Sequence, residues 1–148
     1  MSVECKLENP AALDRYMRNI LCSAKTIAVV GVSPREERPS HRVAKYLTEQ
    51  GYKVIGVNPN CDQIWGAKCY PDLKSIPEHV DVVNIFRRID AIPGIVEEAI
   101  EIGAGAVWMQ LDLEHEDSAQ KARRAGLDVV MNKCTKLEHS RLSCCATT

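Results

Sequence analysis

The sequence predicts an α/β fold with a single doubly wound parallel sheet of Rossmann type and helices on both faces. First, short runs of apolar, mostly β-branched residues recur along the chain, which is typical of parallel strands buried on both faces. Second, helical patterns separate most of these runs, and parallel strands need such crossovers. Third, a chain of 148 residues suits one compact domain.

The chain opens with a predicted helix, in which Asn9 is the N-cap and Pro10 the first helical residue. Its inward face carries the apolar residues Leu13, Met17, Ile20 and Leu21. The run from Thr26 to Gly31 then predicts a central buried strand, and residues 32–39 predict a loop of proline and charge. We expect residues 1–24 to pack on a core domain over 25–139.

A second helix is expected to begin at Ser40 as its cap and to end at Gly51, which supplies a left-handed stop. The strand Lys53 to Val57 completes one βαβ unit. Residues 65–71 have room for one brief strand, and residues 73–77 for one helical turn.

The second half of the chain repeats the alternation. The predicted elements are strands over 80–86, 104–109 and 127–131, and helices over 93–102 and about 115–125. Gly103 and Gly126 end the two helices. Residues 139–148 carry little apolar pattern, so we expect them to fray and treat 140–148 as a tail.

The composition is that of a globular protein, with 45% hydrophobic and 26% charged residues and a mean hydropathy of -0.20. Those values exclude a disordered, collagen-like or membrane-spanning chain. A net charge of -1, from 19 basic and 20 acidic residues, argues against a general binder of nucleic acid or of an anionic membrane.

The cysteine pattern favours the reducing cytoplasm and free thiols, because the count of seven is odd and the N-terminus lacks a secretory signal. The cysteines are Cys5, Cys22, Cys61, Cys69, Cys134, Cys144 and Cys145. Their spacing does not match a zinc site, so no metal is expected.

Ligands of a doubly wound sheet bind outside the carboxyl ends of its strands, where the winding reverses. Four segments are expected to meet there: residues 31–41, residues 58–59, residues 86–88, and residues 108–110 with 132–134. Gly31 lets a ligand approach the backbone, and the start of the helix at Ser40 favours an anion. Arginines in the same region suit phosphate groups: Arg35, Arg38 and Arg42. The alternative is an ordinary turn and cap beside a solvated charged face.

The loop does not match a dinucleotide fingerprint. It keeps one glycine of the three in G-x-G-x-x-G, since Gly31-Val32-Ser33 stands where that motif would begin. Asn58 stands where an NAD domain places an acidic residue for the ribose. Arg87 and Arg88 add positive charge at the same edge, although such a pair is usually a surface feature.

Several short motifs together resemble the small stand-alone CoA-binding domain proteins, relatives of the N-terminal CoA-binding domain of the succinyl-CoA synthetase alpha subunit. The motifs are Gly31-Val-Ser33, Arg38-Pro-Ser40 with Val43, Gly51-Tyr-x-Val54, Val57-Asn-Pro59, Gly66 with Tyr70-Pro71, Phe86-Arg-Arg88, Trp108-x-Gln110, Ala125-Gly-Leu127 and Cys134-x-Lys-x-Glu-His139. The resemblance covers about residues 25–139. It implies a Rossmann-like fold that binds coenzyme A with its phosphates against the Gly31–Ser40 loop.

The predicted cofactor-binding residues come from these segments: Gly31, Val32, Ser33, Arg35, Arg38, Ser40, Asn58, Pro59, Phe86, Arg87, Arg88, Trp108 and Gln110. Core packing is the competing interpretation for Trp108 and Phe86. The chain departs from the family pattern at Asp112, where a glycine is usual, and at Asn132-Lys133, where an acidic-basic pair is usual.

We therefore expect a protein that binds CoA or an acyl-CoA, with no catalytic residues assigned. In the synthetase relatives a phosphorylated histidine belongs to a separate second domain, and the four histidines here form no triad. Two alternatives stay open: a thiol-based enzyme or redox protein that uses Cys134, and, less favoured, an NAD(P)-binding oxidoreductase. A homo-oligomer or an unknown protein partner is also left open, as are the acyl group and the pathway.

Overall fold

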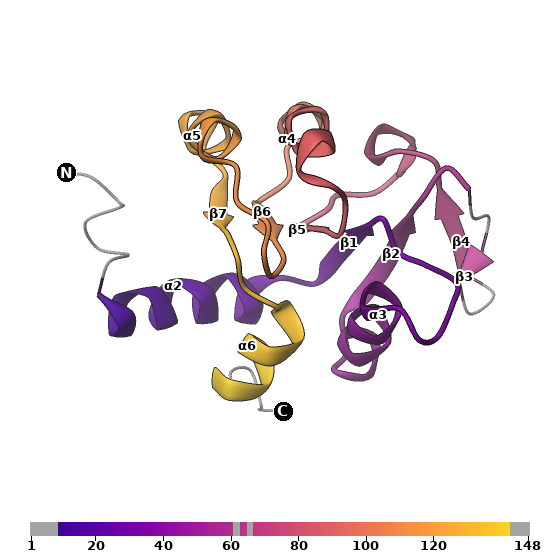
Figure 1. Cartoon of the computed structure of the whole chain (residues 1–148), viewed down its shortest axis with the longest axis horizontal. Helices are drawn as coiled ribbons and strands as arrows, with labels where there is room; N and C mark the ends of the chain where they lie inside the picture. Colours follow the sequence, from indigo (N-terminus) through magenta and orange to yellow (C-terminus); the bar gives the residue numbers. More distant parts are fainter. Residues whose placement is uncertain (1–8, 61–62, 65–66, 143–148) are drawn as a thin grey trace.

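The computed structural model describes residues 9–60, 63–64 and 67–142, and Figure 1 shows the course of the chain. The helices are α2 (Pro10–Ser23), α3 (Pro39–Glu49), α4 (Ile92–Glu101), α5 (Glu116–Arg124) and α6 (Thr135–Leu142), with short 3-10 turns η1 (Leu73–Ser75) and η2 (Ile89–Ala91). The strands are β1 (Thr26–Val30), β2 (Lys53–Val57), β3 (Gln63–Ile64), β4 (Ala67–Tyr70), β5 (Val82–Ile85), β6 (Ala106–Met109) and β7 (Asp128–Val130).

The strands form one sheet in the order β3-β4-β2-β1-β5-β6-β7. The six strands from β4 to β7 pair in parallel, while β3 pairs antiparallel with β4 at one edge. The predicted doubly wound parallel sheet is confirmed, and β3 is the one strand in the described residues that the sequence pattern did not predict. The chain leaves β1 toward β2 on one side and returns to β5 on the other, so the winding reverses beside β1.

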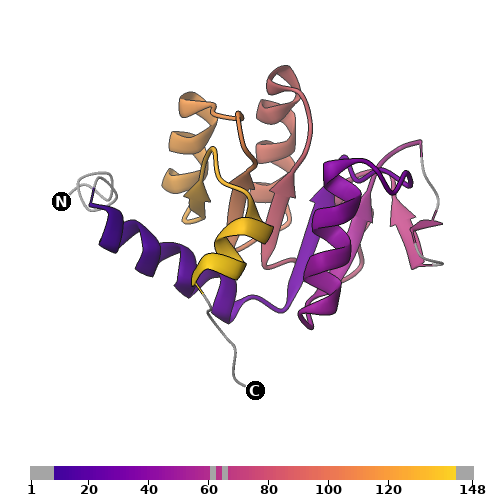
Figure 2. The same cartoon turned by 60° about the horizontal axis from the view of Figure 1, so that its bottom comes forward.

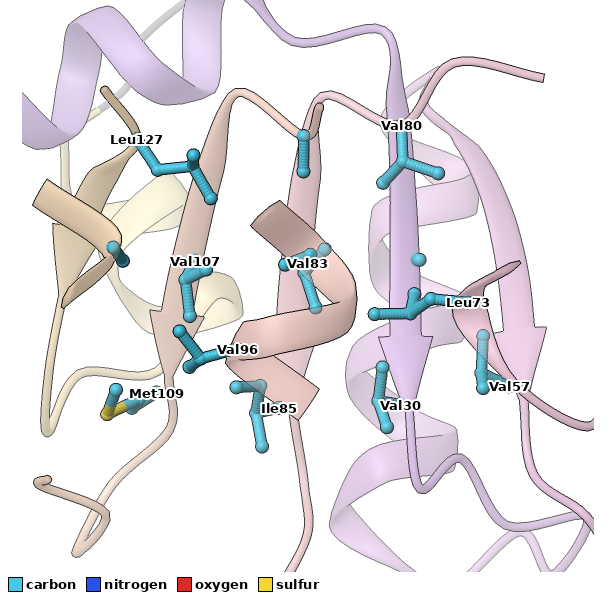
Figure 3. Close-up of a cluster of buried hydrophobic side chains, with 14 of the residues drawn as sticks. Val30, Val57, Leu73, Val80, Val83, Ile85, Val96, Val107, Met109 and Leu127 are labelled. Carbon is cyan, nitrogen blue, oxygen red and sulfur yellow. The ribbon is translucent and has the colours of Figure 1, made fainter. Parts of the chain in front are cut away.

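Helices cover both faces of the sheet, as Figures 1 and 2 show. On one face α4, α5 and η1 pack on Val30, Val83 and Val107. Figure 3 shows this layer, with Val96 of α4 lying over β5 and β6. On the other face, side chains of α2, α3 and α6 pack on the alternate strand residues, Trp108 among them. Burial on both faces explains why the strand sequences are almost continuously apolar.

Two helix starts test the predicted caps. Asn9 caps α2 as predicted, since its Oδ1 accepts hydrogen bonds from the backbone N–H groups of Ala11 and Ala12 at 2.8 and 3.3 Å. The prediction for Ser40 is wrong. Helix α3 begins at Pro39 with Arg38 in the cap position, because proline fits the first helical position without needing its missing N–H.

The end of the chain also differs from the prediction. Residues 139–142 do not fray but belong to α6, which buries His139 and Leu142 against the sheet face that carries α2 and α3. Residues 143–148 of the expected tail lie outside the described residues. The helix was missed because its sequence is mostly polar, so its burial depends on tertiary contacts.

The described residues give three further results on the cysteines, membrane spans and metals. Cys69 and Cys134 are buried and not disulfide-bonded, whereas Cys22 is disulfide-bonded, so the prediction of free thiols is wrong for Cys22. None of the described helices is long and apolar enough to cross a membrane. Within residues 9–60, 63–64 and 67–142, no group of three His, Cys, Asp or Glu side chains is placed to hold a metal ion.

Candidate functional site

A hollow of about 330 Å³ opens at the carboxyl end of β1, beside the first turn of α3. It is lined by Gly31, Ser33, Arg35, Arg38, Pro39, Ser40 and Phe86. Parallel pairing places the ends of three strands level here, because Val30 of β1 pairs with both Val57 of β2 and Ile85 of β5. The hollow therefore lies at the reversal of the sheet, where ligands of this architecture bind.

Two loops come close together at Gly31. Its N–H donates to the Val57 carbonyl at 2.8 Å, and its φ of 90° is one that side-chain-bearing residues rarely adopt. A Cβ atom at this position would lie 2.4 Å from the Phe86 carbonyl oxygen and 2.9 Å from the Arg87 Cδ atom. The close approach of the two loops thus requires glycine at this position.

Side chains of neighbouring elements hold the loop after β1 in one shape. The Asn58 amide donates to the Val32 carbonyl at 2.8 Å. The Ser33 N–H donates to Ser40 Oγ at 3.0 Å, and the His41 ring Nδ1 donates to the Ser33 carbonyl at 2.9 Å. A further bond closes the turn, from the Arg35 N–H to Ser33 Oγ at 3.1 Å. The loop is preorganised before any ligand arrives.

The charge at the hollow is positive. Arg35 and Arg38 line it, and the N-terminus of α3 adds the partial positive charge of the helix dipole. Arg35 lies 3.6 Å from Glu37, but both side chains are well exposed, at 66% and 70%, so this pair is weak and easily exchanged. Arg38 has no ion pair with any residue that the structure describes. Guanidinium groups beside a helix N-terminus suit a phosphate or pyrophosphate group.

A second pocket of about 170 Å³ lies on the other side of Gly31, next to α4. Its lining is Val30, Gly31, Val57, Pro59, Pro71, Asp72, Leu73, Arg87, Ala91, Ile95 and Glu98. Most of these residues are apolar, and Asp72, Arg87 and Glu98 are charged. Oε1 of Glu98 accepts a hydrogen bond from the Leu73 N–H at 3.0 Å, which ties α4 to η1. The two pockets share Gly31, so one elongated ligand can occupy both.

The structure brings most of the predicted site residues together. Six of them line the hollow, Pro59 and Arg87 line the second pocket, and the Asn58 amide holds the loop through the Val32 carbonyl. Arg88 is 88% exposed, lines neither pocket and lies 3.9 Å from Asp90.

Trp108 and Gln110 lie away from both pockets. Trp108 is 0% exposed, and its indole N–H donates to the Lys133 carbonyl at 2.8 Å. Gln110 is buried and hydrogen-bonds to Asn84 and Thr135. Both residues support the core, so core packing, the competing interpretation of the sequence, describes Trp108 better than ligand contact.

Sequence reasoning missed two kinds of residue at this site. His41 was not among the predicted site residues, yet it is 6% exposed and donates to the Ser33 carbonyl. Ile95 and Glu98 were not considered for the site; their spacing of three places them on one helix face, but nothing local indicates which pocket that face meets.

Comparisons with known proteins identify the family. Residues 25–140 match the family model described as CoA binding domain. The chain is 39% identical over 134 residues to the uncharacterized protein YneT of Bacillus subtilis, covering 90% of this chain and 98% of YneT. A solved structure, a hypothetical protein from Pyrococcus horikoshii OT3, has 42% identity and a TM-score of 0.85 and covers 88% of this chain and 92% of that one.

Larger proteins contain a similar region. The chain is 31% identical over 134 residues to acetate–CoA ligase [ADP-forming] I of Archaeoglobus fulgidus, covering 83% of this chain but only 19% of the ligase. This chain thus spans about a fifth of that protein. The match over residues 25–140, with the Gly31 loop and the sheet reversal inside it, shows that the chain belongs to the CoA-binding domain family.

Proposed function

We propose that this protein binds coenzyme A or an acyl-CoA at the two pockets that meet at Gly31, and that residues 25–139 form the binding domain. The hollow beside α3 carries the proposal, because it combines a helix N-terminus with the guanidinium groups of Arg35 and Arg38. The phosphates of CoA bind in this hollow. The family match supports CoA as the source of those phosphates.

The apolar second pocket accommodates the adenine end of the same ligand. Its lining is mostly apolar and includes Val57 and Leu73, and Arg87 of the same lining can meet the 3′-phosphate. An NAD-type ligand suits the site less well, because its ribose needs a carboxylate at the end of β2 and Asn58 stands there.

The structure offers less support for the thiol alternative. Cys134 is 9% exposed and packs in the cluster with Trp108 and Val130, and it lines neither pocket. We therefore favour ligand binding over thiol chemistry. The cytoplasmic location remains a prediction from the sequence.

Thermal melts test the proposal directly. We expect CoA and acetyl-CoA to raise the melting temperature most, dephospho-CoA less because it lacks the 3′-phosphate, and NAD little. A ligand that binds only the folded state at a hundredfold excess over Kd stabilises it by about 2.7 kcal/mol, which corresponds to several degrees. NADP is the control for charge alone, since its extra phosphate is placed differently. Greater stabilisation by NAD or NADP than by CoA would contradict the proposal.

A further inference from the structure

We infer that Asn58 is a positioning residue for the phosphate-binding loop and not a ligand contact, and that this role excludes the acidic residue an NAD site needs. The inference rests on the proposed function and deepens it. Both ends of the Asn58 side chain are engaged by the protein itself. Its Nδ2 donates to the Val32 carbonyl at 2.8 Å, and its Oδ1 accepts from the Asn60 N–H at 2.8 Å.

The bond to Val32 crosses between two strand ends. Val32 follows β1 and Asn58 follows β2, so the amide ties the loop to the neighbouring strand. The same peptide group is also held through its N–H, because Ser40 Oγ accepts from the Ser33 N–H, and His41 donates to the Ser33 carbonyl of the next peptide group. Three consecutive backbone groups of the loop are therefore fixed by side chains. A loop fixed in advance costs a ligand less entropy on binding.

The hydrogen bond to the Val32 carbonyl can form with asparagine at position 58 but not with aspartate. A carbonyl oxygen only accepts hydrogen bonds, so its partner must be a donor. Aspartate has the same shape but presents a carboxylate oxygen to the Val32 carbonyl, which leaves two acceptors facing each other. The residue that would hold an NAD ribose in a related fold would thus loosen the phosphate loop in this chain.

Two variants separate this role from others. Asn58→Ala removes the tie without adding charge, and Asn58→Asp removes only the donor while adding a negative charge. Asn132→Asp is the matched control, because it adds the same charge after β7 and keeps the side-chain oxygen that accepts from the Asp112 N–H at 2.7 Å. The measurements are CoA affinity by calorimetry, amide hydrogen exchange without ligand, and the melting temperature.

We expect both Asn58 variants to weaken CoA binding, roughly three- to tenfold for Asn58→Ala, the range for loss of one hydrogen bond. Exchange should accelerate in residues 31–38 and stay unchanged in the strands, and neither variant should gain affinity for NAD. Unchanged exchange of the loop in Asn58→Ala would overturn the inference, since weaker binding would then reflect a direct ligand contact. Faster exchange throughout the protein would also overturn it, by showing a general structural role.

The same experiments distinguish failure of the proposed function from failure of this inference. If the wild-type protein does not bind CoA, that proposal is wrong, while exchange in the unliganded variants still decides whether Asn58 positions the loop. Weaker binding in Asn58→Asp alone, with Asn58→Ala like the wild type, would show that only charge matters and would overturn the inference.

Discussion

Replacing Gly31 with alanine tests whether the contact between two loops determines the shape of the site. An alanine here must adopt a φ near the observed 90°, which costs about 1–2 kcal/mol for a residue with a Cβ atom. The new Cβ would also lie 2.4 Å from the Phe86 carbonyl oxygen, so backbone has to move. Overpacking of this kind costs about 1–3 kcal/mol, and the two effects together lower the free energy of unfolding by about 2–5 kcal/mol.

Gly126→Ala is the matched control. Gly126 has a φ of 95°, but nothing lies within 4 Å of the position its Cβ would take. Only the conformational cost of about 1–2 kcal/mol applies there. The difference between the two variants, measured by urea unfolding, therefore isolates the contact with Phe86. The Gly31 variant should also lose CoA affinity, because the displaced segment carries Phe86 and Arg87, which line the two pockets.

Equal destabilisation by the two alanines would refute this reasoning. It would mean that the segment after β5 moves away from the new Cβ atom at no cost in free energy. The close contact at Gly31 would then not determine the shape of the site. Equal destabilisation with normal CoA binding in both would further show that ligand access does not depend on this approach.

Three further predictions concern single side chains. Arg38→Ala should weaken CoA binding by about 1–3 kcal/mol and flatten its salt dependence in calorimetry, and an unchanged affinity would assign Arg38 to the solvated surface. Burial lowers the pKa of His139 below its ordinary 6.5, so the unfolded chain binds more protons than the folded protein below that pH. The free energy of unfolding should therefore fall as the pH drops below 6.5, and His139→Phe should flatten that part of its pH profile, measured by urea unfolding. CoA disulfide should leave Cys134 unmodified in the folded protein, because the thiol is buried, and a Cys134 adduct in peptide mass spectrometry would revive the redox alternative.

The strands were predictable because a strand that is buried on both faces has a continuous run of apolar residues in its sequence. The run Thr26 to Val30 needs no knowledge of its partners to indicate a central strand, and β1 occupies those residues. The turn at Gly31 was likewise predictable from the local sequence. The loop, the sheet reversal and most of the residues around them follow from these two facts.

Side-chain direction was harder to predict, and Trp108 shows why. Successive strand residues face opposite sides of the sheet, so Val107 and Met109 join the cluster under α4 and α5, while Trp108 joins the cluster with α2 and α6. Its place one residue before the end of β6 suggested a ligand contact. The residues that bury it come from distant helices, and α6 had too weak a pattern to be predicted. The sequence pattern therefore did not indicate which elements bury Trp108.

The two departures from the family pattern share one structural explanation. Asp112 stands where glycine is usual and has a φ of 68°, and Asn132 has a φ of 60°; in the described part of the chain these are the two residues other than glycine with positive φ. Asp and Asn tolerate this conformation better than most side chains. The Asn132 side chain accepts from the Asp112 N–H at 2.7 Å, and the Asn132 N–H donates to the Leu113 carbonyl at 3.1 Å. The bonds tie the loop after β6 to the loop after β7. The departures thus form one linked pair that lines neither pocket, so they leave the Gly31 loop as the family pattern predicts it.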